Sequence, residues 1–91
     1  MPRIVLTHAV EDIDRWLRGK TERAGAIESG GASNVTDYVA QDGSKNIAIT
    51  ADVADIDAIQ SMLAAPPPEV LALMQAHGVI QPVTLYIESW R

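Results

Sequence analysis

An internal repeat restricts the folds that this chain can adopt. Residues 4–14 (IVLTHAVEDID) align with residues 47–57 (IAITADVADID), and six of the eleven positions are identical. Each copy alternates like a strand and then runs into the start of a helix. The repeat therefore predicts two equivalent strand–helix units.

Each predicted helix begins at an aspartate. Asp12 and Asp55 stand where an N-cap residue is expected, and a second aspartate follows two residues later in each copy, near the positive end of the helix dipole. Apolar residues then recur at helical spacing, from Ile13 in the first helix and from Ile56 in the second. The predicted ends are Gly25 and Gly30-Gly31 for the first helical segment and Pro66-Pro67-Pro68 for the second.

The rest of the chain completes a ferredoxin-like βαββαβ order. Residues 33–40 and 47–53 are predicted to form a hairpin around Asp42-Gly43-Ser44, and residues 79–88 a last strand after a short helix closed by Gly78. We predict an α+β fold in which residues 1–91 make a single domain, with a four-stranded antiparallel sheet and helices on one face. Right-handed crossovers are expected to place the first and third strands side by side and parallel.

Strand alternation divides the sheet into two faces. The helix-covered face is predicted to hold Ile4, Leu6, His8, Val10, Val35, Asp37, Val39, Ile47, Ile49, Ala51, Val53, Val83, Leu85 and Ile87. The opposite face carries small, hydroxylated and aromatic side chains, among them Thr7, Tyr38 and Tyr86. That face is too apolar to stay wet and favours packing against an identical sheet, so we expect a homodimer. A register slip of one residue would exchange the two faces.

Composition and charge exclude several functions. The chain has no cysteine, which excludes disulfides, thiolate metal sites and a cysteine nucleophile. Its net charge is −5 and its basic residues form no stripe with aromatics, so neither nucleic acid nor a membrane is an expected partner. The longest apolar run, residues 70–74, is too short to cross a bilayer, and residues 1–8 do not resemble a signal peptide. We expect a cytoplasmic protein.

His8 is the first candidate for chemistry. It interrupts an apolar strand face at the carboxyl end of the first strand, where such folds open toward ligands. An imidazole with a pKa of about 6.5 suits proton transfer at neutral pH. The structural alternative is a core histidine that is hydrogen-bonded to a backbone carbonyl or a helix end.

Asp37 and His77 are the candidate partners of His8. Asp37 is the odd polar residue of its strand face, where a carboxylate could orient an imidazole; the alternative is an edge-strand charge that prevents unwanted pairing. His77 precedes the last strand, which should run antiparallel beside the first and bring His77 and Gln81 near His8. Alternatively, His77 only interacts with the helix dipole.

The substrate pocket is predicted to include Trp16, Gln81 and Leu6. Trp16 lies on the apolar stripe of the first helix, where a core role is the alternative to a pocket wall. No serine occurs in a nucleophile-elbow pattern, so the histidine and aspartate set indicates proton transfer rather than acyl transfer. No metal site is predicted, because zinc and iron usually need three converging ligands and no HxH or HxxxH spacing is present.

The chain resembles a known superfamily. Residues 7–12 (THAVED) with residues 14–17 (DRWL) after them, the proline-rich break before residues 69–78, and the finish at residues 82–88 (PVTLYIE) are similar to small uncharacterised bacterial proteins of the dimeric α/β-barrel superfamily. The resemblance implies two sheets paired face to face, with a pocket between each sheet and its own helices. Members of the superfamily include cofactor-free monooxygenases, muconolactone isomerases and haem-handling enzymes.

Together these observations predict a small homodimeric enzyme that acts on an apolar or aromatic small molecule by proton transfer, as an isomerase, a cyclase or a cofactor-free monooxygenase. His8 would be the base or acid, with Asp37 or His77 as its partner, and no cofactor is predicted. The main alternative is a non-catalytic dimer that binds a small molecule or another protein. Haem handling, with His8 or His77 as axial ligand, is a third hypothesis.

Overall fold

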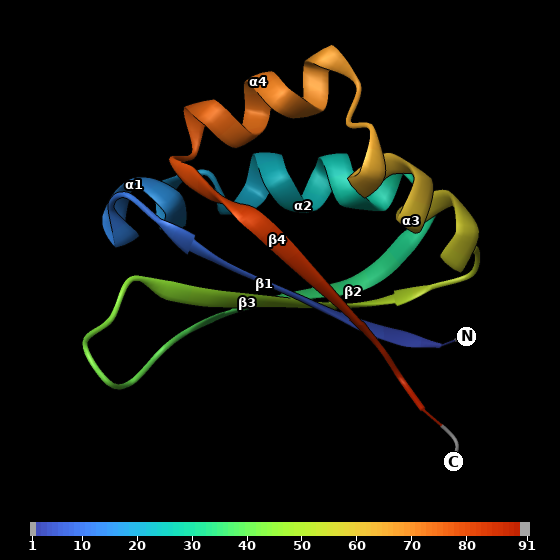
Figure 1. Cartoon of the computed structure of the whole chain (residues 1–91), viewed down its shortest axis with the longest axis horizontal. Helices are drawn as coiled ribbons and strands as arrows, with labels where there is room; N and C mark the ends of the chain where they lie inside the picture. The colour runs from blue at the N-terminus through green and yellow to red at the C-terminus, as the bar shows by residue number, and fades with distance from the viewer. Residues whose placement is uncertain (1, 90–91) are drawn as a thin grey trace.

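The computed structural model describes residues 2–89 and shows helices packed on one face of a sheet (Figure 1). In chain order the elements are β1 (Arg3–Val10), α1 (Ile13–Arg18), α2 (Lys20–Ser29), β2 (Ala32–Val39), β3 (Asn46–Val53), α3 (Ile56–Ala64), α4 (Pro68–Ala76) and β4 (Val79–Ile87). The four strands lie in the order β2-β3-β1-β4, and neighbouring strands are antiparallel. The predicted ferredoxin-like α+β fold is confirmed.

β1 and β3 are antiparallel, so the expected parallel pairing is wrong. Their register pairs Leu6 with Ile49 and His8 with Ile47. The crossover through α1 and α2 joins β1 to β2, and the hairpin then folds β3 back between these two strands. The crossover rule therefore relates β1 to β2, which run parallel with β3 between them.

The first helical segment forms two helices rather than one. α1 starts as predicted, because the Asp12 carboxylate accepts a hydrogen bond from the Arg15 N–H at 3.0 Å. Gly19 ends α1, and α2 then runs through Gly25 to its C-cap at Gly30. The prediction that Gly25 ends this segment is therefore wrong.

The hairpin and the second helix start fold as predicted. In the turn between β2 and β3, the Ser44 N–H donates to the Asp42 carboxylate at 2.8 Å. Asp55 caps α3 by accepting from the Ala58 N–H at 3.1 Å, and α3 ends before the prolines. Both copies of the sequence repeat thus give a strand followed by an aspartate-capped helix.

The end of α4 is fixed by contacts with α1. His77 is the C-cap, and Gly78 has φ of +72°, the left-handed conformation that glycine tolerates just past a helix. Arg15 donates to the carbonyl oxygens of Gln75 and Ala76 at 2.6 and 2.9 Å. These bonds reach carbonyl groups of the last turn of α4, the end of a helix where carbonyls lack partners within the helix, and they join α4 to α1.

The core lies between the sheet and the helices, on the predicted face. Alternate residues of β3 are buried from Ile47 to Val53, as are Ile4 and Val10 of β1. In Figure 1 the helices lie above the sheet, and the lower face of the sheet is uncovered. Tyr38 and Tyr86 belong to that face and are 51% and 56% exposed.

Candidate functional site

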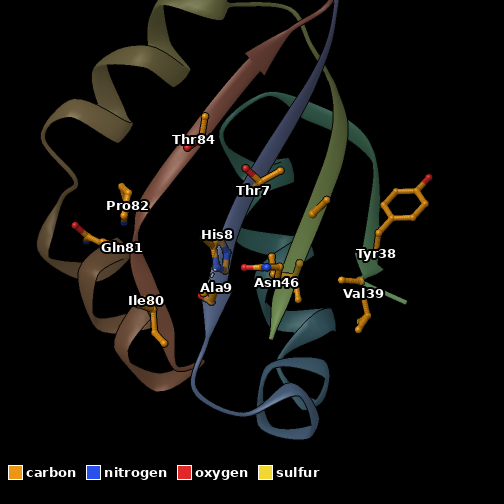
Figure 2. A pocket seen from close by; sticks show the side chains of 13 residues that line it. Thr7, His8, Ala9, Tyr38, Val39, Asn46, Ile80, Gln81, Pro82 and Thr84 are labelled. Carbon is orange, nitrogen blue, oxygen red and sulfur yellow. Dashed lines mark hydrogen bonds between the residues drawn. The ribbon is translucent and has the colours of Figure 1, made fainter. Parts of the chain in front are cut away.

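Two hollows lie on opposite faces of the sheet. One, the helix-side cavity, has a volume of about 520 Å³ and lies between the sheet and the helices. The other, the open-face concavity, has a volume of about 510 Å³ and lies on the uncovered face (Figure 2). The predicted pocket residues are divided between them: Leu6 lines the cavity, whereas His8 and Gln81 line the concavity.

The helix-side cavity is enclosed by β1, β3, α2, α3 and α4. Most of its lining is aliphatic, with Leu6 on the sheet side and Met62 on α3, and its polar side chains are Glu22, Ser29 and Glu69. Small-molecule pockets typically have volumes of about 300–1,000 Å³ and a few polar groups in an apolar wall. The size and lining of this cavity suit an apolar or aromatic ligand.

A buried arginine organises the polar groups next to this cavity. Nη2 of Arg23 in α2 forms a 3.0 Å ion pair with Oδ2 of Asp37 in β2, and the two side chains are 7% and 4% exposed. Nη1 donates to the carbonyl oxygen of Trp16 at 2.9 Å and lies 3.2 Å from Nδ1 of His77. The guanidinium carbon lies 3.9 Å from the centroid of the Trp16 ring, a cation–π stack. We call Trp16, Arg23, Asp37 and His77 the arginine cluster.

The arginine cluster is only partly satisfied by protein hydrogen bonds. Within the described residues, Nε1 of Trp16, Nε of Arg23 and Oδ1 of Asp37 are buried without a partner. A partly satisfied polar network is costlier than an apolar core. Departures of this kind from the usual packing rules are expected at functional sites.

The arginine cluster fixes the tautomer of His77. A guanidinium N–H can only donate, so Nδ1 of His77 accepts from Arg23 and the proton of the neutral ring lies on Nε2. Nε2 in turn lies 3.9 Å from Oε2 of Glu22, a lining residue of the helix-side cavity. Burial and the nearby Arg23 charge lower the pKa of His77, and Glu22 opposes them. His77 is therefore neutral at pH 7 and presents an N–H toward Glu22.

Gly19 gives the His77 ring its place between α1 and α2. A Cβ on Gly19 would lie 2.6 Å from Cδ2 and Cε1 of His77, closer than side-chain carbons approach in proteins. The backbone φ of Gly19 is −86°, which other residues adopt readily. Glycine is needed here because of the close ring, not because of the backbone conformation.

His8 contacts Trp16 but does not belong to the arginine cluster. The two rings are edge to face, with their centroids 6.3 Å apart. Nδ1 of His8 lies 2.8 Å from the carbonyl oxygen of Ala9, so Nδ1 carries the proton and Nε2 keeps its lone pair. Burial lowers the pKa of His8, the Ala9 hydrogen bond raises it, and the Arg23 charge lowers it further. His8 is therefore a neutral imidazole with an unprotonated Nε2.

β4 bulges opposite His8. The register moves from the Thr7–Thr84 pair to the Ala9–Ile80 pair, so β4 advances four residues while β1 advances two. Bulges interrupt the strand ladder and are frequent next to functional sites. This bulge forms one wall of the open-face concavity.

Comparison with known proteins identifies the fold. Neither a protein-family model nor a curated protein matches this chain. Among solved structures, one similar chain is a Bordetella bronchiseptica protein whose name describes it as a putative antibiotic biosynthesis monooxygenase. The two chains align with a TM-score of 0.72 and 8% identity, over 97% of this chain and 94% of that one. The chain shares the ferredoxin-like fold of this protein.

Two further solved structures have a similar fold. A Streptomyces coelicolor monooxygenase in complex with the ligand nanaomycin D has a TM-score of 0.62 and 17% identity, with coverage of 99% of this chain and 87% of that one. A dimeric ferredoxin-like protein from an uncultured marine organism has a TM-score of 0.56 and 8% identity, with coverage of 100% and 99%. At these identities the likeness concerns the fold alone, which is the fold that the sequence resemblance implied.

In this ferredoxin-like fold, Asp37 and His77 both contact Arg23 and do not contact each other directly. Asp37 lies in the edge strand β2 and is buried against Arg23, so its carboxylate pairs with a guanidinium and not with an imidazole. His8 contacts Trp16 instead, and among the described residues no hydrogen bond joins it to Asp37 or His77. The predicted histidine–aspartate set is therefore a chain of contacts with an arginine at its centre.

The two remaining predicted pocket residues lie apart from the helix-side cavity. Trp16 is fully buried and lines neither hollow. Gln81 extends from β4 away from His8 in Figure 2, although both line the open-face concavity. The cavity therefore contains Leu6 as the single pocket residue that was predicted from the sequence.

Sequence reasoning missed Arg23 and Glu22. Arg23 lies seven residues after Trp16, a spacing that keeps both on the same side of a helical segment. An arginine on an apolar stripe needs a buried partner, and Asp37 was the available carboxylate on the facing strand. The ion pair between Arg23 and Asp37 could therefore have been predicted from the sequence. Glu22 has no comparable signal, because an exposed glutamate in a first helical turn is common.

Two further observations concern metals and membranes. Within residues 2–89, no three histidine, aspartate or glutamate side chains are placed to hold a metal ion. None of the helices described for this chain is long and apolar enough to span a bilayer.

Proposed function

We propose that this chain is a small cytoplasmic enzyme, active as a homodimer, that transfers a proton on an apolar or aromatic small molecule held in the helix-side cavity. The observation that carries the proposal is the cavity itself: about 520 Å³, mostly aliphatic, with Glu22 at a polar edge beside the neutral His77. The nanaomycin D complex of a protein with a similar fold supports a small-molecule ligand. The exposed Tyr38 and Tyr86 support pairing through the open sheet face.

In this proposal Glu22 is the general base and His77 assists it. The Glu22 carboxylate lines the cavity and would remove a proton from an activated carbon or a phenol oxygen of the bound molecule. His77 does not line the cavity; its Nε2–H, with Nε2 3.9 Å from Oε2 of Glu22, would orient this carboxylate toward the bound molecule. Proton removal of this kind begins isomerisation, cyclisation and cofactor-free oxygenation alike.

His8 is the alternative base, as the sequence suggested. Its Nε2 is unprotonated, which suits it to accept a proton. It lines the open-face concavity, however, and the partner sheet of a homodimer would cover that face. Glu22 is preferred because it lines the cavity that stays on the helix side.

Hydrogen exchange in D₂O tests the proposal without a known natural substrate. The protein is incubated with a panel of aromatic ketones and phenols, and NMR follows the replacement of carbon-bound hydrogen by deuterium. We expect exchange in at least one compound, reduced roughly 10²- to 10⁴-fold by Glu22→Gln. Glu28→Gln is the matched control, because Glu28 is exposed on the same helix and does not line the cavity.

Two results would contradict this assignment. Exchange that survives Glu22→Gln but disappears in His8→Gln would move the chemistry to the open face. Binding of compounds without exchange in any of them would favour a non-catalytic small-molecule-binding module.

A further inference from the structure

We propose that the helix-side cavity takes a neutral or amine-bearing apolar molecule and discriminates against molecules that carry a carboxylate. This inference rests on the site of the proposed function, but it concerns binding and not catalysis. Two observations support it: the charged residues of the cavity lining are glutamates, and the nearby Arg23 is already paired with Asp37.

Carboxylates are the charged groups of the cavity lining. Glu22 contributes one from α2 and Glu69 another from α4. Among the described residues, no lysine, arginine or histidine lines the cavity. A bound carboxylate would meet two like charges there, whereas an ammonium group would meet two opposite charges.

The nearest buried cation cannot compensate for these carboxylates. Nη2 of Arg23 is paired with Asp37 at 3.0 Å, and Nη1 is engaged by the Trp16 carbonyl and His77. The Arg23 side chain is 7% exposed and does not line the cavity. His77 adds no charge, since burial and Arg23 lower its pKa and keep it neutral at pH 7.

The helix N-termini near the cavity are already matched with carboxylates of the protein. Glu22 lies in the first turn of α2, and Glu69 lies in the first turn of α4. Each carboxylate offsets the positive end of its own helix dipole. A ligand carboxylate would therefore gain little from these helix ends, and the net charge of −5 opposes its approach.

The expected discrimination is moderate because the carboxylates are in contact with water. The Glu22 side chain is 70% exposed, and Glu69 is also exposed. For charges exposed to this extent we expect each glutamate to change the affinity of a charged ligand by up to about fivefold. An amine and a carboxylate of equal size should then differ in affinity by about tenfold or more.

Three probes of one size test the inference. The full chain is titrated at pH 7 and low salt with 1-naphthylmethylamine, 1-naphthalenemethanol and 1-naphthoic acid, and the dissociation constants are measured by calorimetry. We expect the amine and the alcohol to bind at one site and the acid to bind most weakly. Raising the salt to 1 M should narrow the spread, because the Debye length falls to about 3 Å.

Glutamine variants test whether the carboxylates of the cavity lining determine the order of affinities for the three probes. Glu22→Gln and Glu69→Gln should each lower the affinity for the amine and raise the affinity for the acid, by up to about fivefold in each case, and so reduce the ratio of the two affinities. Glu28→Gln changes the net charge equally at a position outside the cavity and should leave the ratio unchanged. Circular dichroism verifies that each variant is folded.

The outcomes separate this inference from the proposed function. Equal binding of acid and amine, or a ratio that neither glutamine variant moves, would overturn the charge selectivity. Binding in the predicted order without hydrogen exchange in any compound would overturn the catalytic proposal and leave the ligand class standing. Failure of all three probes to bind would overturn both.

Discussion

Removal of Arg23 is the sharpest perturbation of this structure. In Arg23→Met the apolar stem of the side chain is retained, but the Asp37 carboxylate, 4% exposed, loses its ion-pair partner. Breaking a buried pair from one side costs about 3–5 kcal/mol, because an uncompensated charge stays buried. For a domain of this size that loss corresponds to about 12–40 °C in Tm. Urea unfolding measures this loss as the difference in the free energy of unfolding between Arg23→Met and the wild type.

Two further variants control the interpretation. Arg23→Met/Asp37→Leu removes both charges and should recover most of the lost stability, since apolar replacement of a buried ion pair is often neutral. Arg3→Met breaks the Arg3–Asp52 pair, whose side chains are 51% and 28% exposed, and should cost no more than about 1 kcal/mol. A loss below about 1 kcal/mol in Arg23→Met, or a double variant as unstable as the single one, would refute the reasoning.

Three other predictions concern the neighbouring residues. Gly19→Ala should lower the free energy of unfolding by about 1–3 kcal/mol and shift the His77 NMR signals, whereas Gly25→Ala, with nothing within 4 Å of its Cβ, should raise it by about 0.5–1 kcal/mol. Equal effects of the two variants in urea unfolding would count against the contact between Gly19 and the His77 ring. NMR titration should give His8 and His77 pKa values below 6.5. Their neutral rings therefore stabilise the folded state above pH 6.5, and this contribution is lost as the pH falls from 6.5 toward the pKa of the folded state. A pKa above 6.5 for either histidine would contradict the burial described. Tyr86 is 56% exposed on the open face, so the wild type should sediment as a dimer and Tyr86→Glu as a monomer; an unchanged mass would argue against pairing through that face.

The elements of this fold could be predicted because local signals agree with the tertiary structure. Asp12 and Asp55 each cap a helix as expected, and the alternation of β3 gives the buried face directly. The break at Gly19 was missed, and so was the reason for a glycine there, which is the close His77 ring from a distant part of the chain. Contacts of that kind have no local signal.

The candidate site was harder to predict for the same reason. Asp37 and His77 were selected as unusual polar residues, and both are buried as members of one cluster. Their common partner, Arg23, was overlooked because an arginine in a helix is usually exposed. The separation of His8 from the helix-side cavity depends on side-chain contacts and on the bulge in β4, neither of which alternation alone reveals.

Ligand-induced shifts in methyl NMR test the central claim most directly, because the two hollows are lined by different methyl groups. The protein is titrated with 1-naphthalenemethanol, which carries no charge and is therefore insensitive to the selectivity argument. We expect saturable shifts at Leu6, Met62 and Leu73, which line the helix-side cavity. Shifts confined to Thr7, Ile80 and Thr84, which line the open-face concavity, or no shifts at all, would contradict it.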